Sequence, residues 1–169
     1  MFQILRVMSV RIISGGQTGV DRAALDAAIE LGIPYGGWCP KGGWAEDLTE
    51  PPGLIARYAA LKQTPLADPS QRTEWNVRDA DRLMILVEGK GLTASRGTRL
   101  ARVSAVRRGK PHIVVDLDAP ASVPQARAFI GKEEGALTLC IAGPRESEAP
   151  GIYVKARTFL RTLLAGARR

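Results

Sequence analysis

Short apolar runs alternate with amphipathic stretches along the chain. The runs consist mainly of Val, Ile and Leu, a composition typical of strands that a parallel sheet buries on both faces. We therefore predict buried strands at Val10–Ile13, Leu83–Val87, Ile113–Val115 and Leu137–Ala142, and a further short strand at Ile33–Tyr35.

The amphipathic stretches predict helices between these strands. In the first stretch Gly32 stands at the usual C-terminal stop, and the apolar residues share one face at helical spacing: Val20, Ala24, Ala27, Ala28 and Leu31. Further helices are predicted at Gln71–Asp81, Ser95–Gly109, Ser122–Gly131 and Pro150–Leu164. This alternation favours a Rossmann-like three-layer α/β fold, with a mainly parallel sheet of about five or more strands flanked by helices.

The length of 169 residues and the hydrophobic content of 45% fit one domain over residues 1–169, with residues 1–9 expected as a flexible N-terminal extension. No apolar run approaches the roughly 20 residues of a membrane helix, and the first residues do not form a secretory signal. We therefore expect a cytoplasmic protein without membrane association. The Gly37–Pro52 segment is long for an ordinary connection, and such loops are often functional.

The charge and cysteine content argue against two kinds of site. The net charge of +7 permits an anionic partner, but the basic residues are scattered, and the three Trp, three Tyr and three Phe do not interleave with them as in a nucleic-acid surface. No nucleic-acid partner is expected. Cys39 and Cys140 stand far apart and outside any Cys/His pattern with metal-ligand spacing, so no metal site is expected.

The stretch "SGGQTGVDRAAL" carries the first candidate site. It follows the first strand and matches G-x-G-x-x-G with Ser14 in the place of the first glycine, which makes a good phosphate seat at a helix N-terminus. The residues in question are Gly15, Gly16, Gln17, Thr18 and Gly19. Ile33–Gly37 supplies no acid for a ribose hydroxyl, so a classical dinucleotide site is doubtful. The alternative is that the turn needs its glycines only for geometry.

Two further segments follow predicted strands, at the edge where such sheets bind ligands. Ser95, Arg96, Gly97 and Thr98 form a second glycine-containing turn at a helix N-terminus. Arg145, in "AGPRES", follows the last strand and can clamp an anion. The alternatives are that Ser95 and Thr98 only cap the helix, and that Arg145 pairs internally with Glu146 or Glu148.

Five segments together resemble the molybdenum cofactor carrier protein family, within the Rossmann-like group that it shares with the LOG nucleotide phosphoribohydrolases. They are "SGGQTGVDRAALDAA", "GGWCPKGGWAED", "RTEWNVRDADRLMILVEG", "SRGTRLA" and "AGPRESEAPGIYVKARTFL". The resemblance implies a homo-oligomer, dimer or tetramer, that stores or hands over molybdenum cofactor (molybdopterin), bound through its phosphate. A nucleotide-binding or nucleotide-processing relative is the alternative.

The resemblance also assigns the candidate residues. Both glycine turns would hold the phosphate. Lys41, Glu46 and Asp47, in the long loop, would face the pterin end, where carboxylates accept hydrogen bonds from N–H groups. Asn76 shares a helix face with Thr73 and Asp79, three residues away on either side, and this face either points into the crevice or is solvated.

An enzymatic role is less favoured than binding. The LOG hydrolases carry P-G-G-x-G-T-x-x-E, whose Glu acts on the ribosyl bond, and Ala101 stands in its place here. His112, the only histidine, begins a predicted strand, and no Ser/His/Asp set forms around it. We therefore assign no catalytic residue.

Overall fold

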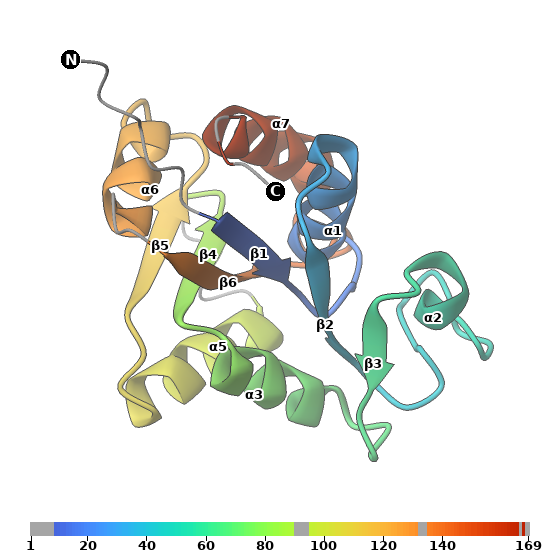
Figure 1. The fold of residues 1–169 in the computed structure, drawn as a ribbon. Coiled ribbons are helices and arrows are strands. Elements are labelled where there is room, and N and C mark those ends of the chain that lie inside the picture. The colour runs from blue at the N-terminus through green and yellow to red at the C-terminus, as the bar shows by residue number, and fades with distance from the viewer. Residues whose placement is uncertain (1–8, 90–94, 132–134, 166, 168–169) are drawn as a thin grey trace.

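A six-stranded sheet forms the centre of the structure, a computed structural model that describes residues 9–89, 95–131, 135–165 and 167 (Figure 1). Its strands pair in the order β3-β2-β1-β6-β4-β5, and every pair is parallel. Their bounds are β1 (Ser9–Ile13), β2 (Tyr35–Cys39), β3 (Leu61–Gln63), β4 (Arg82–Val87), β5 (His112–Asp116) and β6 (Ala136–Ala142). The Rossmann-like α/β prediction is confirmed.

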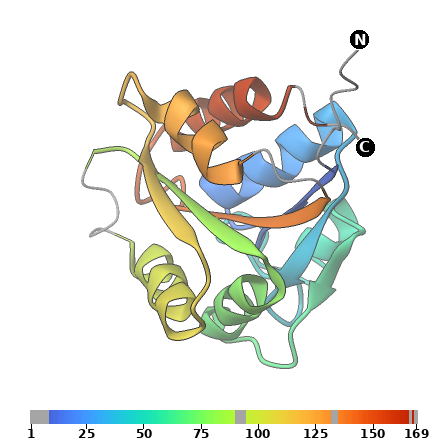
Figure 2. The ribbon, with the colours of Figure 1, turned by 60° about the vertical axis from the view of Figure 1, so that its left-hand side comes forward.

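Helices cover both faces of the sheet (Figures 1 and 2). On one face lie α1 (Val20–Leu31), α6 (Ser122–Ile130) and α7 (Ile152–Leu164), and on the other α3 (Pro69–Asp79) and α5 (Arg96–Arg107). The short helix α2 (Leu54–Arg57) lies beside β3. None of the helices in the described part of the chain is long and apolar enough to cross a membrane.

Alternating side chains of the central strands build the two main cores. In β4, Met84 and Leu86 belong to the cluster under α1 and α7, whereas Leu83, Ile85 and Val87 belong to the cluster under α3 and α5. All five are at most 1% exposed, as expected of a strand buried on both faces. A third cluster joins α2 to the β2–β3 edge.

The strand order positions the site. The last strand, β6, inserts between β1 and β4, so the carboxyl ends of these three strands are neighbours. The chain passes over one face of the sheet through α1 and over the other through α3. In open parallel sheets, ligands bind at such a switch point, beyond the carboxyl ends of the strands.

The second strand was predicted in the wrong place. It overlaps the predicted Ile33–Tyr35 only at Tyr35 and continues to Cys39, so the long loop begins at Pro40 rather than at Gly37. Its sequence, "YGGWC", contains two glycines, which are rare in strands. Gly37 is required there because a Cβ would overlap the Ser14 backbone.

Other boundaries differ for local reasons. The elements β3 and α2 were not predicted because they span only three and four residues. Helix α3 starts at Pro69 rather than Gln71, since Asp68 caps it and proline suits the first turn. Helices α5, α6 and α7 and the other strands agree with the predicted ranges to within about two residues. Ser9 already belongs to β1, and the rest of the expected N-terminal extension lies outside the described residues.

Candidate functional site

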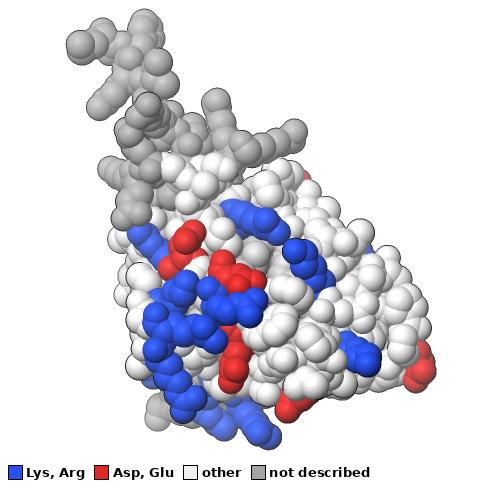
Figure 3. Space-filling view, turned by 60° about the horizontal axis from the view of Figure 1, so that its bottom comes forward, with Lys and Arg blue, Asp and Glu red and all other residues white. Residues whose placement is uncertain are grey.

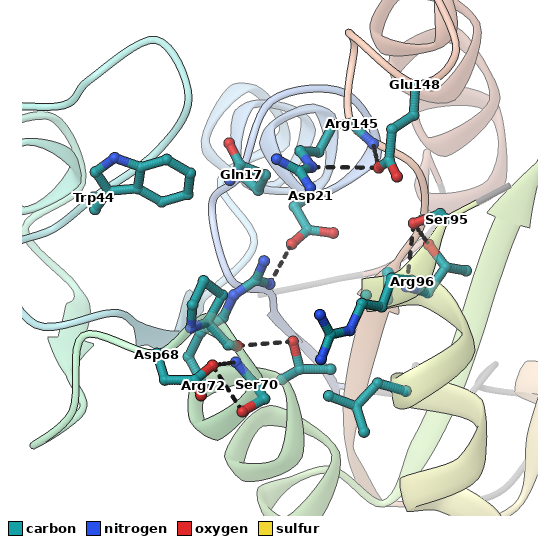
Figure 4. Close-up of a pocket in the computed structure, with 17 residues that line it drawn as sticks. Gln17, Asp21, Trp44, Asp68, Ser70, Arg72, Ser95, Arg96, Arg145 and Glu148 are labelled. Atoms are coloured by element: carbon teal, nitrogen blue, oxygen red, sulfur yellow. Dashed lines mark hydrogen bonds and ion pairs between the residues drawn. The ribbon is translucent and has the colours of Figure 1, made fainter.

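A cavity of about 600 Å³ lies at the carboxyl edge of the sheet (Figure 4). Its lining residues come from segments 17–21, 68–73, 95–100 and 142–148, together with Trp44 from the loop after β2. The N-terminal ends of α1, α3 and α5 all contribute. The volume is in the range of small-molecule sites, which favours a ligand-binding role for this edge.

The predicted turn 95–98 lines the cavity at the start of α5. Ser95 caps the helix, because its Oγ accepts hydrogen bonds from the Thr98 N–H at 3.2 Å and from the Thr98 hydroxyl at 2.8 Å. Both side chains are 2% exposed, so they shape the turn. The Arg96 side chain reaches into the cavity from the same turn, as Figure 4 shows.

Gly97 is the second residue of α5, and none of the described residues requires glycine there. A Cβ at this position would meet none of their atoms within 4 Å, and the backbone φ is not positive. Glycine weakens a helix relative to alanine. Gly97 also lines the cavity, and the absence of a side chain there leaves room for a ligand group to approach the backbone.

Arg72 and Asp21 form a buried ion pair on the cavity wall, and our sequence reasoning missed both. Arg72 Nη1 lies 2.9 Å from Asp21 Oδ2, and the two side chains are 13% and 6% exposed. Arg72 Nε is buried with no hydrogen-bond partner among the described residues. Burial raises the pKa of Asp21, against the opposing effect of Arg72. Both residues lie within segments singled out above, but no sequence spacing links them.

The glycines of the first turn serve the fold. Gly16 and Gly19 have φ of 74° and 78°, which favour glycine. A Cβ on Gly16 would press on Leu54 and Leu61, and one on Gly19 would overlap the Pro144 carbonyl. The N–H of Val20, in the first turn of α1, donates to that carbonyl at 3.2 Å, so the loop after β6 covers this helix end.

The middle of the first turn is tied to the long loop. Gln17 lines the cavity, and its Oε1 accepts from the Thr18 and Glu46 N–H groups, both at 3.0 Å. The Thr18 hydroxyl donates to Glu46, which also accepts from the Ser147 hydroxyl at 2.6 Å. Burial opposes the charge of Glu46, but the hydrogen bonds from Ser147 and Thr18 outweigh it and lower its pKa.

Asp47 makes a second tie between the long loop and α1. Its two carboxylate oxygens accept from the two terminal nitrogens of Arg22, both at 2.8 Å, while Arg22 Nε donates to the Gly16 carbonyl at 2.9 Å. The hydrogen bonds from Arg22 lower the pKa of Asp47. Glu46 and Asp47 therefore bind protein groups and fasten the loop, and neither lines the cavity.

Lys41 and Asn76 lie apart from the main cavity. Lys41 lines a neighbouring hollow of about 450 Å³ that shares Trp44 and Pro69 with the first. Asn76 is 3% exposed; its Nδ2 donates to the Trp38 carbonyl at 2.9 Å and its Oδ1 accepts from the Trp38 N–H at 2.8 Å. The Asn76 amide therefore joins α3 to β2.

Arg145 lies at the cavity and also makes an internal ion pair of the kind considered for it. It lines the cavity, and its guanidinium lies 3.4 Å from Glu148 and 3.8 Å from Glu46. Its side chain is 42% exposed. Of the two internal partners expected from the sequence, Glu148 is thus the one observed. Its carboxylate partly neutralises the positive charge that Arg145 presents to the cavity.

Charge is mixed elsewhere on the molecule. On the face formed by α3 and α5, Lys and Arg gather over one part with Asp and Glu among them (Figure 3). Within the described ranges no group of three or more His, Cys, Asp or Glu side chains has an arrangement that could hold a metal ion. Burial raises the pKa of the Cys39 thiol to about 11, which keeps it protonated.

The fold and the cavity define a class: Rossmann-like α/β proteins with a ligand site at the carboxyl edge of a parallel sheet. The model of the circularly permuted YpsA family, part of the SLOG proteins, matches residues 12–164, and the chain belongs to this family. It is also similar to a crystal structure named "Putative molybdenum carrier protein" from Syntrophus aciditrophicus SB, with 37% identity, a TM-score of 0.81, and coverage of 94% of this chain and 96% of that one. A comparison with curated proteins finds no match.

Proposed function

We propose that the protein binds and carries a small phosphate-bearing ligand in the cavity, with molybdenum cofactor as the first candidate. The observation that carries this proposal is the start of α5, where Arg96 and Gly97 line the cavity. Gly97 is a glycine that the packing of the described residues does not require. The first N–H groups of a helix have no intrahelical partner and favour an anion.

Arg72 adds a second cationic group to the same cavity. Asp21 fixes one end of its guanidinium, and its Nε has no partner among the described residues. A guanidinium held in this way offers a planar fork that matches phosphate oxygens. We therefore assign the phosphate to the space between Arg72, Arg96 and the first turn of α5.

The residues fit molybdopterin at its phosphate end. Arg96 and Gly97 would contact the phosphate, and Arg72 would balance its charge. The bound cofactor would supply its own metal chemistry after transfer, and this chain would supply the binding site. The name of the Syntrophus protein supports the same role.

A nucleotide is the second candidate. The cavity combines a phosphate site with an aromatic side chain, Trp44, and a nucleotide carries both a phosphate and an aromatic ring. In both cases we propose a binding protein that forms a homo-oligomer. Light scattering coupled to size-exclusion chromatography measures the oligomer, and a monomer at micromolar concentration would contradict that part.

The test begins with mass spectrometry and absorbance of the purified, denatured protein, which identify a retained pterin or nucleotide. Calorimetric titration with ribose 5-phosphate then compares Arg96→Gln with Arg102→Gln. Both variants remove one positive charge from α5, but Arg102 is exposed and does not line the cavity. We expect Arg96→Gln to weaken binding by about tenfold or more and Arg102→Gln to leave it nearly unchanged, since one lost charged hydrogen bond costs about 1.5–3 kcal/mol. Equal losses in the two variants would contradict the proposal.

A further inference from the structure

Trp44 is the one aromatic residue among those that line the two adjoining hollows in the described part of the chain. The other two tryptophans pack on each other: the rings of Trp38 and Trp75 lie edge to face with centroids 4.7 Å apart. Trp44 has no ring contact or side-chain hydrogen bond among the described residues, and it is half-buried. Figure 4 shows its indole extending into the cavity, across from Arg96.

The backbone on both sides of Trp44 is held in place. Gly43 accepts a hydrogen bond from the Leu54 N–H at 2.8 Å. Ala45 is fully buried and exchanges two backbone hydrogen bonds with Leu48, at 3.1 and 3.0 Å. The backbone that carries the indole is therefore held in place before any ligand arrives, and only the side-chain torsions of Trp44 remain to be ordered, which limits the entropic cost of binding to it.

The two carboxylates expected from the sequence at the far end of the ligand are engaged elsewhere, and Lys41, expected with them, lines the second hollow. Glu46 accepts from Thr18 and Ser147, and Asp47 is bound to Arg22. Neither carboxylate is available to select a ring, whereas the face of an indole binds any planar aromatic ring by stacking.

We propose that Trp44 is the stacking platform for a planar fused heterocycle, on a ligand whose phosphate lies at the first turn of α5. This inference rests on the proposed function and narrows its ligand class. The ligand is a heterocycle joined to a phosphate, as in a pterin phosphate or a nucleoside monophosphate, and a plain sugar phosphate would use only half of the site.

The experiment separates the two ends of the ligand. Calorimetric titrations with GMP and with ribose 5-phosphate use the same phosphate and sugar and differ by the ring. Both titrations are run on the parent protein, on Trp44→Leu and on the matched control Trp75→Leu, which removes an indole that does not line the cavity.

We expect GMP to bind the parent at least tenfold more tightly than ribose 5-phosphate, which is about 1.4 kcal/mol. Trp44→Leu should remove this difference and keep the affinity for ribose 5-phosphate, while Trp75→Leu should change neither. GMP should also quench the parent's tryptophan fluorescence, and Trp44→Phe, which keeps an aromatic face, should retain most of the difference and lose the quenching.

Other outcomes overturn the platform. Equal affinities for GMP and ribose 5-phosphate in the parent would overturn the stacking role of Trp44 and leave the phosphate site intact. Failure of the parent to bind either probe would overturn the proposed function as well. Loss of ribose 5-phosphate binding in a folded Trp44→Leu protein would mean that the indole only shapes the cavity. If Trp44→Leu fails to fold, the Trp44→Phe quenching result decides.

A third titration, with neopterin monophosphate, separates the two ligand classes. Tighter binding of neopterin monophosphate than of GMP would point to a pterin ligand, and the reverse order would point to a nucleotide. Either order supports stacking on Trp44.

Discussion

The guanidinium of Arg72 lies over Gly15, in the space that a side chain at residue 15 would fill. Asp21, in the first turn of α1, holds the same guanidinium through its Oδ2 at 2.9 Å. The first glycine turn thus contributes to the cavity by admitting an arginine from α3. A residue distant in sequence brings the positive charge that the turn itself lacks.

Gly15→Ala is expected to lower both stability and phosphate affinity. The new Cβ would displace Arg72 and leave the buried Asp21 carboxylate without its partner, a loss of about 1–3 kcal/mol in the free energy of unfolding. Urea denaturation measures the first effect and titration with ribose 5-phosphate the second.

A double-mutant cycle tests the cause of that loss. In an Arg72→Ala background, where the guanidinium is already absent, Gly15→Ala should cost much less than in the parent. The same cost in both backgrounds would show that overlap with Arg72 is not the reason that residue 15 is glycine.

Gly97→Ala is expected to separate stability from binding. Alanine should raise the free energy of unfolding by about 0.4–1 kcal/mol, because the site accepts a Cβ and the backbone is already helical. Affinity for ribose 5-phosphate should fall several-fold because the methyl group narrows the approach to the backbone. A stabilised variant with unchanged affinity would mean that the ligand does not approach residue 97.

Arg145→Gln is expected to weaken ribose 5-phosphate binding less than Arg96→Gln does. Glu148 and Glu46 already share the charge of Arg145. The melting temperature should change little, since partly exposed ion pairs contribute about 0–1 kcal/mol. A larger affinity loss in Arg145→Gln than in Arg96→Gln would make Arg145 the main anchor instead.

The sequence could predict the layered fold because strand and helix periodicities are local properties. The roles of individual glycines depend on contacts made across the molecule: Gly16 faces Leu54 and Leu61, whereas Gly97 faces open space, although both stand in glycine turns after parallel strands. For the same reason Arg72 was missed and Asn76 was included. Spacing shows which residues share a helix face, but it does not show what that face contacts. The Asn76 side chain binds the Trp38 backbone rather than facing the cavity.

The protein is expected not to release ribose 5-phosphate from GMP above the background rate. By the resemblance to the LOG hydrolases, Ala101 takes the place of their acid, and it is 1% exposed within the apolar cluster under α5. Product analysis after long incubation with repurified protein measures any release. Steady turnover that follows the protein through purification would contradict a carrier role.

Acid should loosen the long loop that presents Trp44. Hydrogen bonds from Arg22 lower the pKa of Asp47 below its ordinary value of 3.8. For Glu46, burial acts in the other direction, but bonds from Ser147 and Thr18 still lower its pKa below 4.5. Both carboxyls therefore bind protons less readily in the folded chain than in the unfolded one. Their contribution to stability is complete above the ordinary values and is lost as pH falls through the lowered ones.

We therefore expect the melting temperature of the parent to fall as pH drops below about 4.5, and the fall to be shallower in Asp47→Asn, which cannot titrate at that position. Differential scanning calorimetry from pH 7 to pH 3 measures both curves. Asp118→Asn is the matched control: it removes an exposed carboxylate that pairs with Lys155, away from the loop. If loop fastening by Asp47 contributes to folding, Asp47→Asn should also melt lower than the parent at pH 7 while Asp118→Asn stays close to it. Parallel curves for the parent and Asp47→Asn would show that the Arg22–Asp47 pair does not couple the loop to the stability of the fold.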